Sequence, residues 1–180
     1  MNLVAFTGRA GSGKSTAANA VVGKFGFVRI SFAYAIRSML YALGFTKWHF
    51  GEGKNTPLDW LDGKTPREIM QTLGTEWGRT LVHPDLWVRL AKRTAENLLA
   101  AGARGIVIDD VRFDNEAKII RELGGLVIGI ERPGLSTMSH ASEAGVDRAL
   151  VDFWLQNSPA ISEPQFCASV IALVSVNQNS

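Results

Sequence analysis

The stretch GRAGSGKST, residues 8–16, is the strongest indication of the fold of this 180-residue chain. Its spacing fits the pattern G-x-x-x-x-G-K-[ST], in which a glycine-rich turn presents backbone N–H groups to an anion. In that pattern the lysine, here Lys14, reaches the outer phosphates of a nucleoside triphosphate, and the Ser15 hydroxyl can bind magnesium. The other residues expected around the phosphates are Gly8, Gly11, Ser12, Gly13 and Thr16.

The flanks of this stretch support that assignment. The apolar run at 2–6 predicts a strand before the turn, and apolar residues at helical spacing from Ala17 to Phe25 predict a helix after it. The N-terminus of such a helix adds partial positive charge beneath bound phosphates. A chance match in a glycine-rich turn would not be expected to have both a strand before it and a helix after it. The sequence therefore predicts a nucleoside triphosphate site, and it says little about the phosphate acceptor.

The composition predicts one globular domain over residues 1–180. The chain is 46% hydrophobic and 20% charged, and its net charge of +2 is too small to argue for a nucleic-acid partner. The single cysteine excludes an internal disulfide and favours the cytosol. We recognise no signal peptide, and the late apolar run at 168–176 is too short to span a membrane.

Strand and helix patterns alternate along the chain. Further strands are expected at 27–31, 105–110, 126–131 and 151–155, and helical spacing recurs between them. Such alternation is typical of a parallel sheet covered by helices on both faces, with ligands at the carboxyl ends of the strands. The prediction is a three-layer α/β fold with a five-stranded parallel sheet.

The segment 44–66 interrupts this alternation. It contains four glycines, two prolines and two tryptophans without periodicity, which is typical of a functional loop. A helix is expected to begin near Thr65 and Pro66, and another to run over 84–101. We expect 44–82 to be an insertion that binds the acceptor.

A second group of polar residues, IDDVRFDNE at 108–116, ends the strand at 105–110. Because the carboxyl ends of parallel strands share one edge of a sheet, this group should lie near the phosphate loop. Asp110 would hold magnesium directly or through water, Arg112 would clamp a second phosphate, and Glu116 would complete the reaction centre. The alternative is that Asp109 or Asp114 caps the next helix and that Arg112 pairs with Glu116.

Two further stretches offer positive charge. Arginine suits a phosphate monoester and tryptophan suits a base, and Arg67, Arg79 and Trp87 lie near apparent element ends. Arg89 and Arg93 are expected on a solvated helix face. The segment 132–145 supplies Arg132 and is either a short lid over the triphosphate or a surface connection.

Five stretches together resemble the phage deoxynucleoside monophosphate kinase family: GRAGSGKST, GKTPREIMQTLGTEWGR, DLWV, DDVRFDNEA and HASE. The resemblance covers most of the chain. It implies a nucleoside monophosphate kinase-like P-loop fold, transfer of the γ-phosphoryl group of ATP to a deoxynucleoside monophosphate, and a magnesium requirement.

The resemblance also assigns residues by position. Lys14, Ser15 and Thr16 would serve ATP and magnesium, and the residues expected to face the deoxynucleotide are Trp87, Asp110, Arg112 and Glu116. Asp109 departs from the family pattern, in which a small polar residue is expected there. This leaves open which aspartate meets the metal, and Asp110 is the one expected.

Two other functions stay open from the sequence. A kinase acting on dephospho-coenzyme A or phosphomevalonate would share the phosphate loop without the stretch at 65–79. A P-loop ATPase or switch would hydrolyse ATP without an acceptor. The expected partners are ATP and a deoxynucleoside monophosphate, without a nucleic-acid polymer or a membrane, and a homodimer is left open. The expected location is the cytoplasm, that of the host if the chain is phage-encoded.

Overall fold

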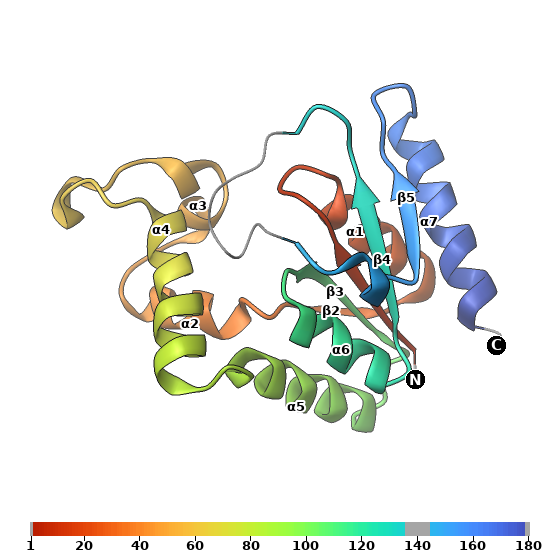
Figure 1. Ribbon diagram of the computed structural model, residues 1–180, viewed down its shortest axis with the longest axis horizontal. Coiled ribbons are helices and arrows are strands. Elements are labelled where there is room, and N and C mark those ends of the chain that lie inside the picture. Colours follow the sequence, from red (N-terminus) through yellow and green to blue (C-terminus); the bar gives the residue numbers. More distant parts are fainter. Residues whose placement is uncertain (1, 136–144, 179–180) are drawn as a thin grey trace. The chain divides into compact units, whose positions relative to one another are not determined.

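Figure 1 shows the computed structural model, which describes residues 2–135 and 145–178. The chain divides into two compact units, one formed by residues 1–31 and 90–180 and the other by residues 32–89. We call them unit 1 and unit 2 and describe each by itself. Over the described part of the chain, we find no helix with the length and apolar character needed to cross a membrane.

Unit 1 is built on a parallel sheet with the strand order β2-β3-β1-β4-β5. The central strand, β1, pairs with β3 on one side and β4 on the other, and all five of its residues are buried. The strands are β1 (Leu3–Thr7), β2 (Val28–Ile30), β3 (Ile106–Val111), β4 (Leu126–Glu131) and β5 (Phe153–Gln156). The expected α/β fold with a five-stranded parallel sheet is confirmed.

Helices cover both faces of this sheet (Figure 1). Val4 and Phe6 of β1 pack in one core with α1 (Lys14–Phe25) and α7 (Glu163–Gln178). Because strand side chains alternate, Leu3 and Ala5 face the other way, where α6 (Asp114–Glu122) contacts β1 and β4. Most of α5 (Leu86–Ala100) and the short turn η5 (Arg148–Leu150) complete unit 1.

Unit 2 has a small core of its own, with Ile36, Leu40, Phe45, Leu58 and Trp87 buried together. The aperiodic stretch at 44–66 consists of short helical turns joined by bends rather than one open loop. The elements are α2 (Tyr34–Ala42), α3 (Lys47–Phe50), η1 (Glu52–Asn55), η2 (Asp59–Leu61), α4 (Pro66–Gln71) and η3 (Thr72–Val82).

The helix α4 begins where the sequence predicts it. Thr65 is the N-cap, its hydroxyl accepts a hydrogen bond from the Glu68 backbone N–H at 3.2 Å, and Pro66 occupies the first turn. The Glu68 carboxylate accepts in return from the Thr65 backbone N–H at 2.7 Å, which lowers the pKa of Glu68. This reciprocal pair specifies the start of the helix.

The helix then continues into η3, an 11-residue π-helix. Such a length is unusual, because most π-helices are single-turn bulges. Trp87 packs against Gly78 so closely that a Cβ atom there would overlap its ring, and Trp87 Nε1 donates to the Gly74 carbonyl at 2.7 Å. The buried Trp87 side chain thus contacts the π-helix at two positions, Gly74 and Gly78.

We expect Gly78→Ala to destabilise unit 2, because the new methyl group would meet the buried Trp87 ring and overpacking costs about 1–3 kcal/mol. Gly74→Ala is the matched control, since its Cβ would lie 3.2 Å from the movable Ile36 Cδ1 and alanine favours helical backbone. Denaturant unfolding followed by tryptophan fluorescence measures both variants. Equal stability of the two would contradict the packing role of Gly78.

Candidate functional site

The phosphate loop connects β1 to α1 at the centre of the sheet. Gly8 and Gly13 both have positive φ, 140° and 106°. A Cβ at Gly8 would overlap the Ile130 carbonyl oxygen of β4, and a Cβ at Gly13 would overlap the Asn157 side chain. Only glycine combines a favourable positive φ with the absence of a Cβ atom, so the structure of the loop requires glycine at both positions.

Hydrogen bonds from two side chains to backbone carbonyls stabilise the phosphate loop. Lys14 Nζ donates to the carbonyl oxygens of Gly8 and Arg9, each at 2.7 Å. Asn157, just beyond β5, donates from Nδ2 to the Ser12 carbonyl at 2.8 Å. The lysine ammonium therefore lies over the turn whose backbone would surround a phosphate.

The Ser12 side chain is a second feature of the loop. It is fully buried, and its hydroxyl has no hydrogen-bond partner among the residues that the structure describes. A buried polar group of this kind costs free energy unless something else satisfies it. The loop therefore contains a polar atom that its own fold does not use.

Ser15 meets an acidic residue of β3. Its hydroxyl donates to Asp109 Oδ2 at 2.8 Å, although 94 residues separate the two. Asp109 is only 8% exposed. A hydroxyl and a carboxylate side by side beneath a phosphate loop are the hard oxygen ligands that Mg²⁺ prefers.

Asp109 also binds a cation of the protein itself. Arg29 of β2 forms a bidentate ion pair with it, from Nε to Oδ1 at 3.1 Å and from Nη2 to Oδ2. The same guanidinium donates to the Asn19 side chain at 2.9 Å and to the Ser15 hydroxyl at 3.2 Å. Arg29 is thus part of the Ser15–Asp109 group.

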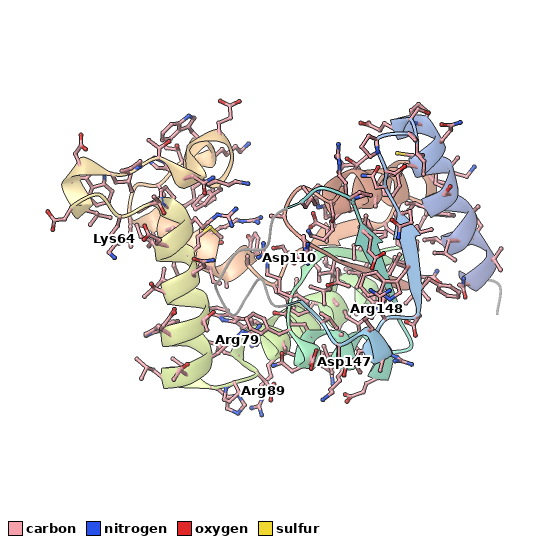
Figure 2. The ribbon with its side chains drawn as sticks, turned by 45° about the horizontal axis from the view of Figure 1, so that its top comes forward. Lys64, Arg79, Arg89, Asp110, Asp147 and Arg148 are labelled. Carbon is pink, nitrogen blue, oxygen red and sulfur yellow. The ribbon has the colours of Figure 1, made fainter. Side chains whose placement is uncertain are left out.

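Asp110 lies in a different environment (Figure 2). Its Oδ2 accepts a hydrogen bond from the Ser31 hydroxyl at 2.6 Å. Strand alternation explains the difference: Asp109 shares its side of β3 with Val107, which packs in the core beneath α1, whereas Asp110 points the opposite way. The structure brings Asp109, and not the expected Asp110, to Ser15.

Glu116 has a clear structural partner. It is 2% exposed, and its Oε2 accepts from the backbone N–H groups of Arg112 at 2.7 Å and Phe113 at 3.2 Å. Asp114 instead begins α6 and accepts from the Asp147 backbone at 2.9 Å. The alternative interpretation expected Asp109 or Asp114 to cap this helix and Arg112 to pair with Glu116. In the structure Glu116 caps the helix, and it accepts from the Arg112 backbone N–H.

The residues expected at the acceptor from 64–93 all lie in unit 2. Arg67 Nε donates to Asn55 Oδ1 at 3.0 Å, and Arg79 Nη1 donates to the Pro84 carbonyl at 3.1 Å. Figure 2 shows Arg79 on the η3 helix. Trp87 is 3% exposed within the core of unit 2, so its contact with a deoxynucleotide stays a prediction.

The chain around the expected lid is only partly described. Residues 136–144, most of the 132–145 segment, lie outside the described residues, while Arg132 is exposed directly after β4. Beyond the gap, Arg148 stacks on the Trp154 ring and bonds Glu131 at 2.6 Å, beside β5 in Figure 2. Arg148 and Gln156 lower the pKa of Glu131. This ion pair ties η5 to the end of β4.

Three residues with notable contacts or burial were not predicted from the sequence: Arg29 and Asn157 in unit 1, and Arg37 in unit 2. The one charged residue in the otherwise largely apolar strand predicted at 27–31 is a signal for Arg29. Arg37 of α2 has a buried Nε without a hydrogen-bond partner among the described residues. Nothing in the local sequence marks Asn157, since its contact with the loop is made across 145 residues.

The arrangement in unit 1 has a definite chemical capacity. A glycine loop with a helix N-terminus and Lys14 can hold a triphosphate, and Ser15 with Asp109 can hold a divalent cation at its edge. Among the described residues no group of three or more His, Cys, Asp or Glu could form a metal site from protein alone. In phosphate-binding sites Mg²⁺ is held by one or two carboxylates of the protein, and substrate phosphates and waters complete its shell.

Comparisons with known proteins agree with this capacity. A family model described as deoxynucleotide monophosphate kinase matches residues 62–165. A protein of Acanthamoeba polyphaga mimivirus, whose name assigns it to the deoxynucleotide monophosphate kinases, is 34% identical over 97% of this chain and 96% of its own. The deoxynucleoside-5'-monophosphate kinase of Escherichia phage T5 is 31% identical over 52% of this chain and 39% of its own.

Two solved structures have a fold similar to that of this chain. A dephospho-CoA kinase from Campylobacter jejuni matches with a TM-score of 0.52 at 20% identity, covering 99% of this chain and 98% of that one. A sugar kinase from Janibacter sp. HTCC2649 matches with a TM-score of 0.54 at 13% identity, covering 97% and 95%. At such identities the likeness shows a common P-loop kinase fold and says nothing about the substrate.

The family model and the mimivirus relative decide the classification. The model covers more than half of the chain and includes 63–79 and 109–117, the stretches GKTPREIMQTLGTEWGR and DDVRFDNEA of the predicted resemblance. The mimivirus relative extends the match to nearly the whole chain. The expected resemblance and the expected class, an ATP-dependent nucleotide kinase, are confirmed, and the chain belongs to the deoxynucleotide monophosphate kinase family.

Proposed function

We propose that this chain transfers the γ-phosphoryl group of ATP to a deoxynucleoside monophosphate, which yields ADP and a deoxynucleoside diphosphate. The observation that carries the proposal is the family match over nearly the whole chain together with an intact phosphate loop. A phosphate oxygen of the acceptor attacks the γ-phosphorus while the bond to the β-phosphate oxygen breaks. Because the attacking oxygen is already anionic, the protein has mainly to align and neutralise charge.

The residues of unit 1 suit the ATP side of this reaction. Lys14 and the backbone of 8–16 would hold the phosphates, and Arg132 would approach them from the end of β4. The donor set of Ser15 and Asp109 fits magnesium, which when bound neutralises phosphate charge during transfer. In this proposal Asp109 takes the metal role that the sequence favoured for Asp110.

The next residues along β3 suit the acceptor side. Asp110 faces away from Ser15, and Arg112 offers a planar guanidinium for the acceptor phosphate. Glu116 acts on this group indirectly, because its carboxylate holds the Arg112 backbone N–H. We therefore treat Arg112 as an acceptor contact and Glu116 as the residue that positions it.

Unit 2 supplies further positive charge for the acceptor. The buried Arg37 Nε lacks a hydrogen-bond partner among the described residues, and an unsatisfied buried donor is costly unless a ligand satisfies it. Arg67 and Arg79 carry guanidinium groups on α4 and η3. An acceptor phosphate is the anion that such groups would bind.

The direct test is ADP formation from ATP, measured with each deoxynucleoside monophosphate, each ribonucleotide, dephospho-coenzyme A and no acceptor. We expect turnover with at least one deoxynucleoside monophosphate and little without an acceptor. Lys14→Met, which removes the ammonium over the loop, should lower that turnover by at least ~100-fold in a folded protein. Turnover only with dephospho-coenzyme A, or equal turnover without acceptor, would refute the proposal.

Substitution of each aspartate of β3 should have a different effect on the magnesium dependence of the activity. Asp109→Asn removes the charge beside Ser15, and we expect the magnesium concentration for half-maximal activity to rise by ~10-fold or more. Asp110→Asn should leave that concentration nearly unchanged and raise the acceptor KM. Activity titrated with magnesium and with acceptor measures both effects. The reverse pattern would return the metal role to Asp110.

Arg67→Ala should raise the KM for the monophosphate by ~10-fold or more, since bonds to a charged group are lost, and leave the KM for ATP nearly unchanged. Arg89→Ala is the matched control, because Arg89 is exposed on the first turns of α5 in the same unit (Figure 2). Steady-state kinetics with each substrate varied in turn give the four constants. An equal rise in both KM values for Arg67→Ala would indicate a structural role.

A further inference from the structure

The ion pair between Arg29 and Asp109 has no place in the phosphoryl transfer described above. The guanidinium occupies both carboxylate oxygens, and Oδ2 also accepts from Ser15. The carboxylate is sheltered, since the Asp109 side chain is 9% exposed, whereas the Arg29 side chain is 36% exposed. In this state the carboxylate has little freedom to accept a metal ion.

Arg29 is held on its other side as well. Its Nη1 donates to Asn19 Oδ1 on α1 at 2.9 Å, so the guanidinium spans from α1 to β3. Five N–H donors in a rigid plane make such a placement well defined. The positive charge therefore stays beside the two oxygens that suit a divalent cation.

We propose that Arg29 is a positioning residue that acts as a built-in counter-cation, closing the Ser15–Asp109 pair to a free divalent ion until ATP brings the metal with it. Two cations so close together repel one another, and the repulsion is strong in a sheltered site. The triphosphate reverses this balance, because its negative charge offsets the guanidinium and its oxygens complete the metal shell. The role of ATP here rests on the proposed function.

The experiment measures Mn²⁺ binding by electron paramagnetic resonance, first without nucleotide. We expect Arg29→Gln to bind Mn²⁺ at least ~10-fold tighter than the wild type, because a nearby positive charge has been removed. Arg29→Lys keeps the charge and should remain within ~3-fold of the wild type. Arg93→Gln, which removes the same charge from the exposed face of α5, should change nothing.

Asp109 supplies the second half of the test. Arg29→Gln combined with Asp109→Asn should lose the gain in Mn²⁺ affinity. Asp109→Asn alone should leave nucleotide-free binding unchanged, because Arg29 already occupies the carboxylate, and should weaken Mn²⁺ retention once ATP is added. This single variant keeps the proposal testable even if Arg29→Gln fails to fold.

Several results would overturn the proposal. They are Arg29→Gln binding Mn²⁺ no tighter than the wild type, Arg29→Lys binding as tightly as Arg29→Gln, and a gain that survives Asp109→Asn. Asp109-dependent Mn²⁺ binding by the wild type without nucleotide would overturn it too. None of these measurements contains an acceptor, so a failure to phosphorylate deoxynucleoside monophosphates would refute the proposed function and leave this inference standing.

Discussion

The central position of β1 is the constraint on which the rest of unit 1 depends. Its neighbours β3 and β4 pair with it on both sides, as far as Thr7 at its carboxyl end. The phosphate loop that follows passes against the Ile130 carbonyl and the Asn157 side chain, and both approaches require glycine. The same parallel pairing brings the end of β3 to this edge, which is why Asp109 meets Ser15.

The alternation of side chains along β3 assigns different environments to two adjacent aspartates. Asp109 faces α1, is buried and pairs with Arg29, whereas Asp110 faces the Ser31 hydroxyl. A shift of one residue in this strand would exchange the two environments, because the side-chain period of a strand is two. The difference between the metal and acceptor roles that we propose for them therefore depends on the register of β3 with β1.

Unit 2 depends on one aromatic side chain in a comparable way. Trp87, from the first turn of α5, fills the core beside Ile36 and Leu40 and bonds the Gly74 carbonyl. Its ring fits only because Gly78 has no side chain, so this glycine of the LGTEWGR stretch serves the packing of the π-helix. This packing fixes the backbone of η3, from which Arg79 projects. Part of the LGTEWGR stretch is therefore explained by packing, and not every residue in it needs a contact with the substrate.

The parallel sheet, the phosphate loop and the start of α4 were predictable from the sequence, because the alternation of strand and helix patterns, the glycine spacing and the Thr65–Glu68 cap are local patterns with one physical solution. It also indicated the family, through stretches that are contiguous in the chain. The meeting of Ser15 with Asp109 rather than Asp110, and the pairing of Arg29 with that carboxylate, are visible only in the tertiary structure. The two pairings with Asp109 depend on which face of β3 lies beneath α1, and the burial of Glu116 depends on how α6 packs on the sheet. Both are set by contacts between residues far apart in the sequence, which no local pattern encodes.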